Sequence, residues 1–345
     1  MTTATTRAPA WTAAVLGRPV AGGAVRCDAC PFRCTLPEGR TGICGVRRNA
    51  GGTLVTSTFA TSVAHLDAVE RKPFFHVRPG SRVLTLAAPG CTFRCTYCIN
   101  HRLSQYGRED DVPWTAEPAD PAALVERARA AGAAIGLSYT EPGLAPELTL
   151  ALAELAAPQG IPVLWKTNGF LTPAAVDLVA PALTAVNIDL KGADEDAHRR
   201  LTGAPLAPVL DTVERFLAAG VWVELSTPLV PGSAAEPEQL RAIARRIAAI
   251  SPDLPWHLLR FTPDFRLTAA PPTSPAALAA GVREGREAGL RYVYVERALD
   301  EPGRRTGCPG CGTTVVERDV WALRRSLLER GACPACRTPV PGIWS

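Results

Sequence analysis

Three closely spaced cysteines constrain this chain more than any other feature of its sequence. Cys91, Cys95 and Cys98 stand at Cys-x3-Cys-x2-Cys spacing, directly after the apolar run of residues 83–88. Thiolates are the usual ligands of iron–sulfur clusters. A [4Fe–4S] cube has four irons, and three neighbouring cysteines hold only three of them. The spacing therefore predicts a [4Fe–4S] cluster whose fourth iron is open to a ligand from outside the chain.

The alternatives are a structural zinc site and a set of unrelated buried thiols. Structural zinc takes four closed ligands. No fourth cysteine lies near Cys98, although His101 could complete such a set. We favour the cluster because cysteine spacing is among the stronger signals that a sequence carries.

The eleven cysteines fall into groups of four, three and four. An odd total argues against a pure disulfide framework. CxxC pairs without a secretory signal in residues 1–18 indicate metal ligands in a reducing compartment, so we expect a cytoplasmic protein. The first group has x2, x3 and x9 spacing, which suits either structural zinc or an auxiliary [4Fe–4S] cluster, and both remain open. Its members are Cys27, Cys30, Cys34 and Cys44.

The last group consists of two CxxC pairs separated by a 21-residue spacer, Cys308 with Cys311 and Cys333 with Cys336. Each pair offers two thiolates from one tight turn, and tetrahedral coordination brings the two turns together, so this pattern predicts a zinc ribbon. The alternative is a redox or cluster role for these four cysteines, and we favour structural zinc. A tail of about 40 residues has little core of its own, and we expect metal binding to supply much of its folding free energy.

Apolar, β-rich runs alternate with Ala/Leu/Arg-rich helical stretches from about residue 80 onward. We predict strands at 83–87, 134–139, 162–166, 185–190, 221–230, 256–261 and 292–295. We predict helices at 121–131, 146–156, 173–179, 206–218, 237–249 and 275–288, most of which have a proline near the first turn. This alternation is typical of an α/β fold, and six or seven units indicate a partial (β/α) barrel of TIM type.

The predicted barrel takes residues 80–303. A poorly ordered N-terminus (1–24) and a cysteine-rich metal-binding region (25–79) precede it, and the ribbon-like extension (304–345) follows it. The formal net charge of +4 is small and gives no case for nucleic-acid binding. No apolar run reaches the roughly 18 residues of a membrane span, so we expect no membrane association.

Polar residues follow four of the predicted strands, in the stretches 138–142, 166–170, 187–192 and 257–265. Each stretch is weak by itself, because Asn168-Gly169 is usually only a turn and a lone His257 is more often structural than catalytic. Catalytic groups of a TIM-type barrel lie at the carboxyl ends of its strands. Four such stretches together favour an active site at that end.

The combined motifs resemble the radical S-adenosylmethionine (SAM) enzymes, and within them the radical SAM component of the AmmeMemoRadiSam system, in the lineage of pyruvate formate-lyase activating enzymes. The triple-cysteine loop alone indicates only the superfamily. The closer resemblance covers residues 25–345 and rests on motifs along the whole chain. They are the first cysteine group with Gly-Ile-Cys-Gly-Val-Arg (42–47), Lys-Pro-Phe-Phe-His (72–76), Pro-Gly-Ser (79–81), Tyr-Thr-Glu-Pro (139–142), Thr-Asn-Gly-Phe (167–170), Ile-Asp-Leu-Lys-Gly (188–192), Leu-Val-Pro-Gly (229–232), Pro-Trp-His (255–257) and the terminal CxxC pairs.

The resemblance implies that Cys91, Cys95 and Cys98 hold the [4Fe–4S] cluster and that SAM chelates its open iron. It also implies that Tyr97 packs near the adenine and that Glu141 accepts a hydrogen bond from the SAM amino group. The other positions that it implies for the SAM pocket are Asn100, Thr140, Lys166, Thr167, Asn168, Asp189, Lys191 and Thr262.

Two positions depart from the activating enzymes. Those enzymes carry an acid, part of a cation site beside SAM, where this chain has Lys166, and a histidine where this chain has Thr262. The two departures put glycyl-radical activation in doubt and leave SAM cleavage intact.

The resemblance implies reductive cleavage of SAM to methionine and a 5′-deoxyadenosyl radical, which removes a hydrogen from a substrate that the sequence does not identify. It also implies an electron donor of flavodoxin or ferredoxin type, and either a small-molecule substrate or a partner protein. Two alternatives remain: an activase that installs a glycyl radical on a separate enzyme, and a metal-binding interaction module with two ribbons on a barrel. The last leaves the open three-cysteine site unexplained.

Overall fold

An eight-stranded sheet forms the centre of the computed structural model, which describes residues 9–108, 112–296 and 303–345. Seven strands run parallel, and β8 pairs antiparallel with β9 at one edge. In spatial order the strands are β16 (Val293–Val295), β15 (Trp256–Arg260), β14 (Trp222–Leu229), β13 (Ala185–Asp189), β12 (Val163–Thr167), β11 (Ala133–Leu137), β9 (Arg82–Leu86) and β8 (Ala64–Ala68). The sheet ends at β16 and β8, so the barrel is open, and the predicted partial (β/α) barrel is confirmed.

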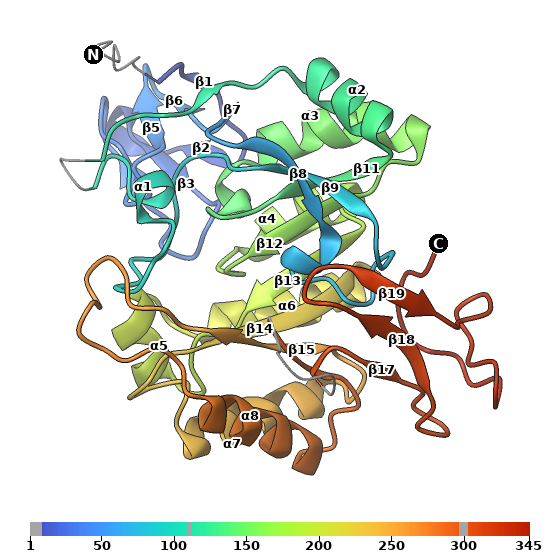
Figure 1. Cartoon of the computed structure of the whole chain (residues 1–345). Coiled ribbons are helices and arrows are strands. Elements are labelled where there is room, and N and C mark those ends of the chain that lie inside the picture. Colours follow the sequence, from blue (N-terminus) through green and yellow to red (C-terminus); the bar gives the residue numbers. More distant parts are fainter. Residues whose placement is uncertain (1–8, 109–111, 297–302) are drawn as a thin grey trace, which may run out of the picture.

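Helices connect the parallel strands and cover the outer face of the sheet, with α2 and α3 over one part of it and α7 and α8 over another (Figure 1). Five of the described helices start at a proline. In α2, α4 and α8 a capping side chain precedes the proline, and at the start of α4 Thr172 accepts a hydrogen bond from the Ala175 amide. The helices are α1 (His101–Ser104), α2 (Pro121–Ala131), α3 (Pro146–Ala156), α4 (Pro173–Val179), α5 (Glu195–Thr202), α6 (Ala207–Ala218), α7 (Pro237–Ile250) and α8 (Pro275–Glu287). Single 3₁₀ turns are η1 (Ala21–Gly23), η2 (Val69–Arg71), η3 (Pro142–Leu144), η4 (Ala157–Gln159) and η5 (Ala180–Ala182).

Small antiparallel sheets lie beside the central sheet and use mainly residues that precede β9. They are formed by β1 (Thr12–Ala13), β6 (Thr53–Thr56) and β5 (Arg47–Ala50), by β2 (Gly17–Pro19), β3 (Val25–Cys27) and β4 (Thr35–Leu36), and by β7 (Ala60–Thr61) with β10 (Glu117–Pro118). The paired strands β1 and β2 correct the expectation of a poorly ordered segment up to residue 24, of which residues 1–8 lie outside the described residues. Residues 64–68, which were assigned to the cysteine-rich region without a predicted strand, form β8 at the edge of the central sheet.

A three-stranded antiparallel sheet ends the chain, with β17 (Thr306–Gly307), β18 (Thr314–Arg318) and β19 (Leu323–Ser326). Figure 1 shows it well apart from the N-terminal sheets. Its buried side chains pack into one apolar cluster with Phe75, Tyr292 and Tyr294 of the barrel. The Arg318 guanidinium donates a hydrogen bond to the Phe75 carbonyl, and the Ile343 amide donates to the His76 carbonyl at 2.7 Å. The tail therefore shares its core with the barrel.

Among the described residues, no helix combines the length and the apolar character needed to cross a membrane.

Candidate active site

A cavity of about 440 Å³ lies at the carboxyl ends of the parallel strands. It brings together every residue that the sequence predicted for the cluster and SAM sites. These are Cys91, Cys95, Tyr97, Cys98, Asn100, Thr140, Glu141, Lys166, Thr167, Asn168, Asp189, Lys191 and Thr262. They follow or end five different strands, because parallel strands place their carboxyl ends at one edge of the sheet.

The cysteine loop between β9 and α1 supplies three thiols to one wall of this cavity. Cys95 is buried, and Cys91 and Cys98 are half-buried. Asn168 supports the loop from β12, since its Nδ2 donates to Thr92 Oγ1 at 2.9 Å and lies 3.6 Å from Cys91 Sγ. The cavity lining contains three cysteines and no fourth. This donor set fits a cluster with one open iron better than a closed zinc site.

His101, the fourth ligand of the alternative zinc site, points elsewhere. Its Nδ1 lies 3.1 Å from the Cys98 carbonyl oxygen, and its ring stacks on Phe265 with 4.6 Å between centroids. Among the described residues, no group of metal-ligating side chains with all ligand atoms within 4.8 Å includes Cys91, Cys95 or Cys98. The zinc alternative for this loop therefore has no support in the geometry.

Glu141 is held by three hydrogen bonds at the end of the β11 loop. Its Oε1 accepts from the Gly143 amide at 2.8 Å and from Thr167 Oγ1 at 2.6 Å, and its Oε2 accepts from the Asn168 amide at 2.8 Å. The residue is only 1% exposed, and burial raises the pKa of its carboxyl group to about 7. Oε2 accepts one hydrogen bond within the chain, which leaves it able to accept another from a ligand in the cavity.

Two lysines share one aspartate opposite Glu141. Lys166 Nζ donates to Asp189 Oδ1 and, at 2.7 Å, to Asn187 Oδ1, while Lys191 Nζ donates to Asp189 Oδ2 at 2.7 Å. Burial alone would raise the pKa of Asp189, but the two ammonium groups outweigh it and keep that pKa below its usual range. Burial lowers the pKa of Lys166, although Asp189 works against it. Two cations on one anion leave a net positive charge, which suits an anionic group of a ligand.

Tyr97 adds an unpartnered polar group to the cavity. Its ring packs edge-on to Phe261 at 6.1 Å, and its hydroxyl is buried without a hydrogen-bond partner in the described part of the chain. Buried hydroxyl groups normally have partners, so this group is consistent with a site completed by a ligand. Thr140 is half-buried and Thr262 is exposed.

Sequence reasoning missed several residues of this site. Arg71 and Trp321 line the same cavity, with the guanidinium 4.6 Å from the indole ring centre, although Trp321 belongs to the terminal sheet. Tyr139 also lines it, in a left-handed backbone conformation (φ 71°), and its hydroxyl accepts a hydrogen bond from Lys72 Nζ at 2.8 Å. Tyr139 stands in the polar stretch 138–142, but the sequence assigned it no role in the site. No local pattern marks Arg71 or Trp321, because only the fold brings them to the cavity. His257 lies outside it, buried with Nε2 2.5 Å from Glu224 Oε2, in keeping with a structural role.

The other two cysteine groups lie outside this cavity. In the terminal group all four sulfur atoms lie within 4.8 Å of one another, with 3.4 Å between Cys308 and Cys336 and 3.8 Å between Cys311 and Cys333. This arrangement can hold a metal ion. The N-terminal group has three buried members and a half-buried one, Cys34.

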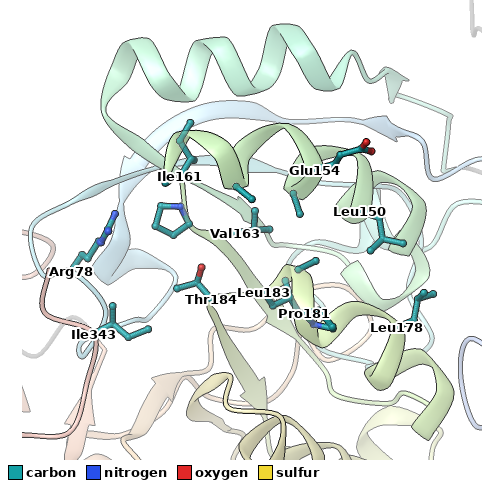
Figure 2. Close-up of a pocket in the computed structure, with 15 residues that line it drawn as sticks. Arg78, Leu150, Glu154, Ile161, Val163, Leu178, Pro181, Leu183, Thr184 and Ile343 are labelled. Carbon is teal, nitrogen blue, oxygen red and sulfur yellow. The ribbon is translucent and has the colours of Figure 1, made fainter.

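A larger hollow of about 660 Å³ lies at the opposite end of the barrel, where β12 begins (Figure 2). Its walls are mainly aliphatic, and its charged side chains are Arg78 and Glu154. It contains no cysteine or histidine. This hollow therefore offers no thiol or imidazole ligand, in contrast to the smaller cavity at the carboxyl ends.

Comparison with known proteins agrees with this geometry. Residues 86–244 match the model of the Radical SAM superfamily. The chain is similar to an uncharacterized protein of Methanocaldococcus jannaschii, with 34% identity over 90% of this chain and 93% of the relative. It is 31% identical to an isethionate sulfite-lyase activating enzyme of Oleidesulfovibrio alaskensis, over 37% of this chain and 43% of that enzyme. It is 32% identical to a benzylsuccinate synthase activating enzyme of Thauera aromatica, over 30% of this chain and 32% of that enzyme. The chain therefore belongs to the radical SAM superfamily, and about a third of it is similar to activating enzymes.

Proposed function

We propose that this radical SAM enzyme holds its [4Fe–4S] cluster at Cys91, Cys95 and Cys98 and binds SAM in the cavity beside them. The observation that carries this proposal is the convergence of all thirteen predicted residues on one cavity. When bound, the reduced cluster supplies the electron that breaks the C5′–S bond of SAM, which yields methionine and a 5′-deoxyadenosyl radical. The barrel positions SAM and keeps water from the radical.

In this proposal, different residues of the chain bind different parts of SAM. Glu141 Oε2 accepts a hydrogen bond from the amino group, and the ammonium groups of Lys166 and Lys191 face the carboxylate. Tyr97 packs near the adenine. The Asn168 amide that approaches Cys91 Sγ supports a thiolate there.

We infer that the electron donor is a flavodoxin- or ferredoxin-like protein and that the enzyme works in the cytoplasm. The substrate is a small molecule or a partner protein. Activation of a glycyl-radical enzyme is the second candidate, which the similarity to activating enzymes favours. Lys166 and Thr262, where those enzymes have an acid and a histidine, argue against it.

An anaerobic assay for 5′-deoxyadenosine tests the proposed function. With a reductant and SAM, the wild-type protein should release 5′-deoxyadenosine, and the correct substrate should increase its yield. If a glycyl-radical enzyme were the substrate, its EPR spectrum would gain a glycyl radical. A protein with a complete cluster that forms no 5′-deoxyadenosine under any of these conditions would contradict the proposal.

SAM affinity should depend on pH through Glu141. The carboxyl group has a pKa of about 7 and must be ionised to pair with the SAM ammonium. Below pH 7 the carboxyl group is mostly protonated and must lose its proton when SAM binds, so the affinity should rise with pH, by at most about tenfold per unit, and level off above about pH 7. Glu141→Gln should remove this dependence and lower affinity about thirtyfold, the equivalent of about 2 kcal/mol for a lost charge-assisted hydrogen bond.

Titration of SAM binding from pH 6 to pH 8.5 measures the effect of Glu141. The cluster's EPR signal in each variant shows whether the site has stayed intact. Glu154→Gln is the matched control, since Glu154 is exposed on the other hollow (Figure 2). Equal SAM affinity in Glu141→Gln and the wild type would remove Glu141 from the site.

Lys166 should take the place of a bound monovalent cation. Its side chain is 15% exposed and paired with Asp189, so it does not point into solvent. Wild-type SAM cleavage should not depend on sodium or potassium, and Lys166→Ala should lose activity. Lys166→Asp would set two carboxylates side by side, which a monovalent cation can bridge, so potassium or sodium should restore part of the activity.

The measurement for Lys166 is 5′-deoxyadenosine formation at constant ionic strength, with N-methylglucamine replacing potassium or sodium. A wild-type rate that rises steeply with either cation would speak against this role, as would unchanged SAM affinity in Lys166→Ala.

A further inference from the structure

The N-terminal cysteine group lies directly against the loop that carries Cys91. A Cβ built on Gly90 would stand 3.3 Å from the Cys44 carbonyl oxygen, and Gly90 has a left-handed backbone (φ 95°). Because any side chain would collide here with Val46, at 2.8 Å, glycine is needed for this approach. The two cysteine groups, far apart in the sequence, therefore touch through the backbone next to their ligands.

One guanidinium ties the two groups together. Arg108 Nε donates to the Ile43 carbonyl at 2.5 Å, next to Cys44. The same side chain donates to the Phe93 carbonyl at 2.7 Å and to the carbonyl of Cys91. The planar guanidinium group of Arg108 thus holds the backbone beside one cysteine of each group.

Aromatic rings fill the space on the other side. Phe32, between Cys30 and Cys34, packs on Phe170 at 5.0 Å, and Phe170 packs on Phe93 at 5.5 Å. Cys30 belongs to the same apolar cluster as Phe93. Packed side chains therefore fill the space between the two cysteine groups.

The spacing of the sulfur atoms separates zinc from a cluster. With Zn–S bonds of about 2.3 Å, tetrahedral geometry places the ligand sulfurs about 3.8 Å apart, and the terminal four cysteines approach this arrangement. Among the residues that the structure describes, the N-terminal four do not form a group within 4.8 Å, and neither do Cys91, Cys95 and Cys98. Wider spacing of the sulfur atoms suits a [4Fe–4S] cluster, because each cysteine binds a different iron. Four cysteines would coordinate all four irons.

We propose that the N-terminal cysteines Cys27, Cys30, Cys34 and Cys44 hold a second [4Fe–4S] cluster, which relays electrons to the cluster at Cys91, Cys95 and Cys98. The relay rests on the proposed function of that first cluster. A low-potential one-electron carrier of the flavodoxin or ferredoxin class reduces the second cluster by one electron. The second cluster is oxidised again when it passes this electron to the first, and SAM cleavage consumes it.

Metal analysis and EPR of the anaerobically reconstituted full-length protein test the site. The wild type should contain about eight irons and one zinc, and its reduced spectrum should contain two [4Fe–4S]⁺ signals, of which SAM changes one. The double variant Cys30→Ser/Cys44→Ser should lose about four irons and the signal that SAM does not change. About four irons and two zinc ions in the wild type would overturn the second cluster.

The rate of 5′-deoxyadenosine formation with reduced flavodoxin tests the relay. The double variant should lose this activity while its remaining cluster signal still responds to SAM, which shows that the SAM site is folded. An unchanged rate would overturn the relay. If the wild type contained two clusters and SAM changed the EPR signal of neither, the proposed function would be contradicted but the second metal site would not. Failure of the relay and failure of the proposed function are therefore distinguishable.

Discussion

Replacing Cys91, Cys95 and Cys98 together by alanine should abolish SAM cleavage and remove about four irons from the protein. The three thiols line the cavity and its lining contains no other cysteine, so no ligand of the same kind can replace them. Without the cluster there is no electron for the C5′–S bond, and 5′-deoxyadenosine should fall to the uncatalysed background. The measurements are iron content, 5′-deoxyadenosine yield and the SAM-dependent EPR signal.

Thr96→Ala is the matched control for this triple variant. Thr96 lies in the same loop, half-buried, and does not line the cavity. It should keep its iron and its activity, and we expect one zinc ion, bound by the four terminal cysteines, in both proteins. A triple variant that retains a cluster signal perturbed by SAM would show that other residues hold the cluster.

Cys333→Ser should release one zinc ion and unfold the terminal sheet. Cys333 is fully buried among the four sulfur atoms, and structural zinc needs all four ligands. Structural zinc contributes on the order of 10 kcal/mol to the folding of small domains. The tail packs on Phe75, Tyr292 and Tyr294, so its loss should also expose barrel core and lower the midpoint of thermal unfolding.

Zinc content, protease sensitivity of residues 303–345 and thermal unfolding measure this effect. The control is Ser326→Ala, an exposed change in the same sheet, which should alter none of the three. Trp321 lines the cavity, so SAM affinity in Cys333→Ser reports whether the tail also shapes the site. Equal zinc content in Cys333→Ser and the wild type would exclude zinc coordination by this group.

The spacing of residues in the sequence determined most of the local structure. Each of the seven parallel strands and the six predicted helices lies within two residues of its predicted bounds, because apolar runs bounded by proline and glycine act locally. Helix α5 was missed because Glu195–Thr202 is mostly polar and lacks the proline in the first turn that all six predicted helices have. The edge strand β8 was missed because its pairing with β9 depends on a partner rather than on its own pattern.

The sequence also predicted the chemistry that we propose for the central site. Ligand type and spacing are local properties, so Cys91, Cys95 and Cys98 could be found without the fold. The polar residues after the strands could be placed together because parallel strands end at one edge of the sheet.

Only the tertiary structure decided which distant segments complete the site. Trp321 reaches the cavity because the terminal sheet shares a core with Phe75 and Tyr294. Arg108 joins the first two cysteine groups because the N-terminal sheets pack against the cysteine loop. Such contacts depend on packing between segments that are far apart in the sequence and carry no periodic pattern. They could not be predicted because the sequence of one segment does not specify which other segment packs against it.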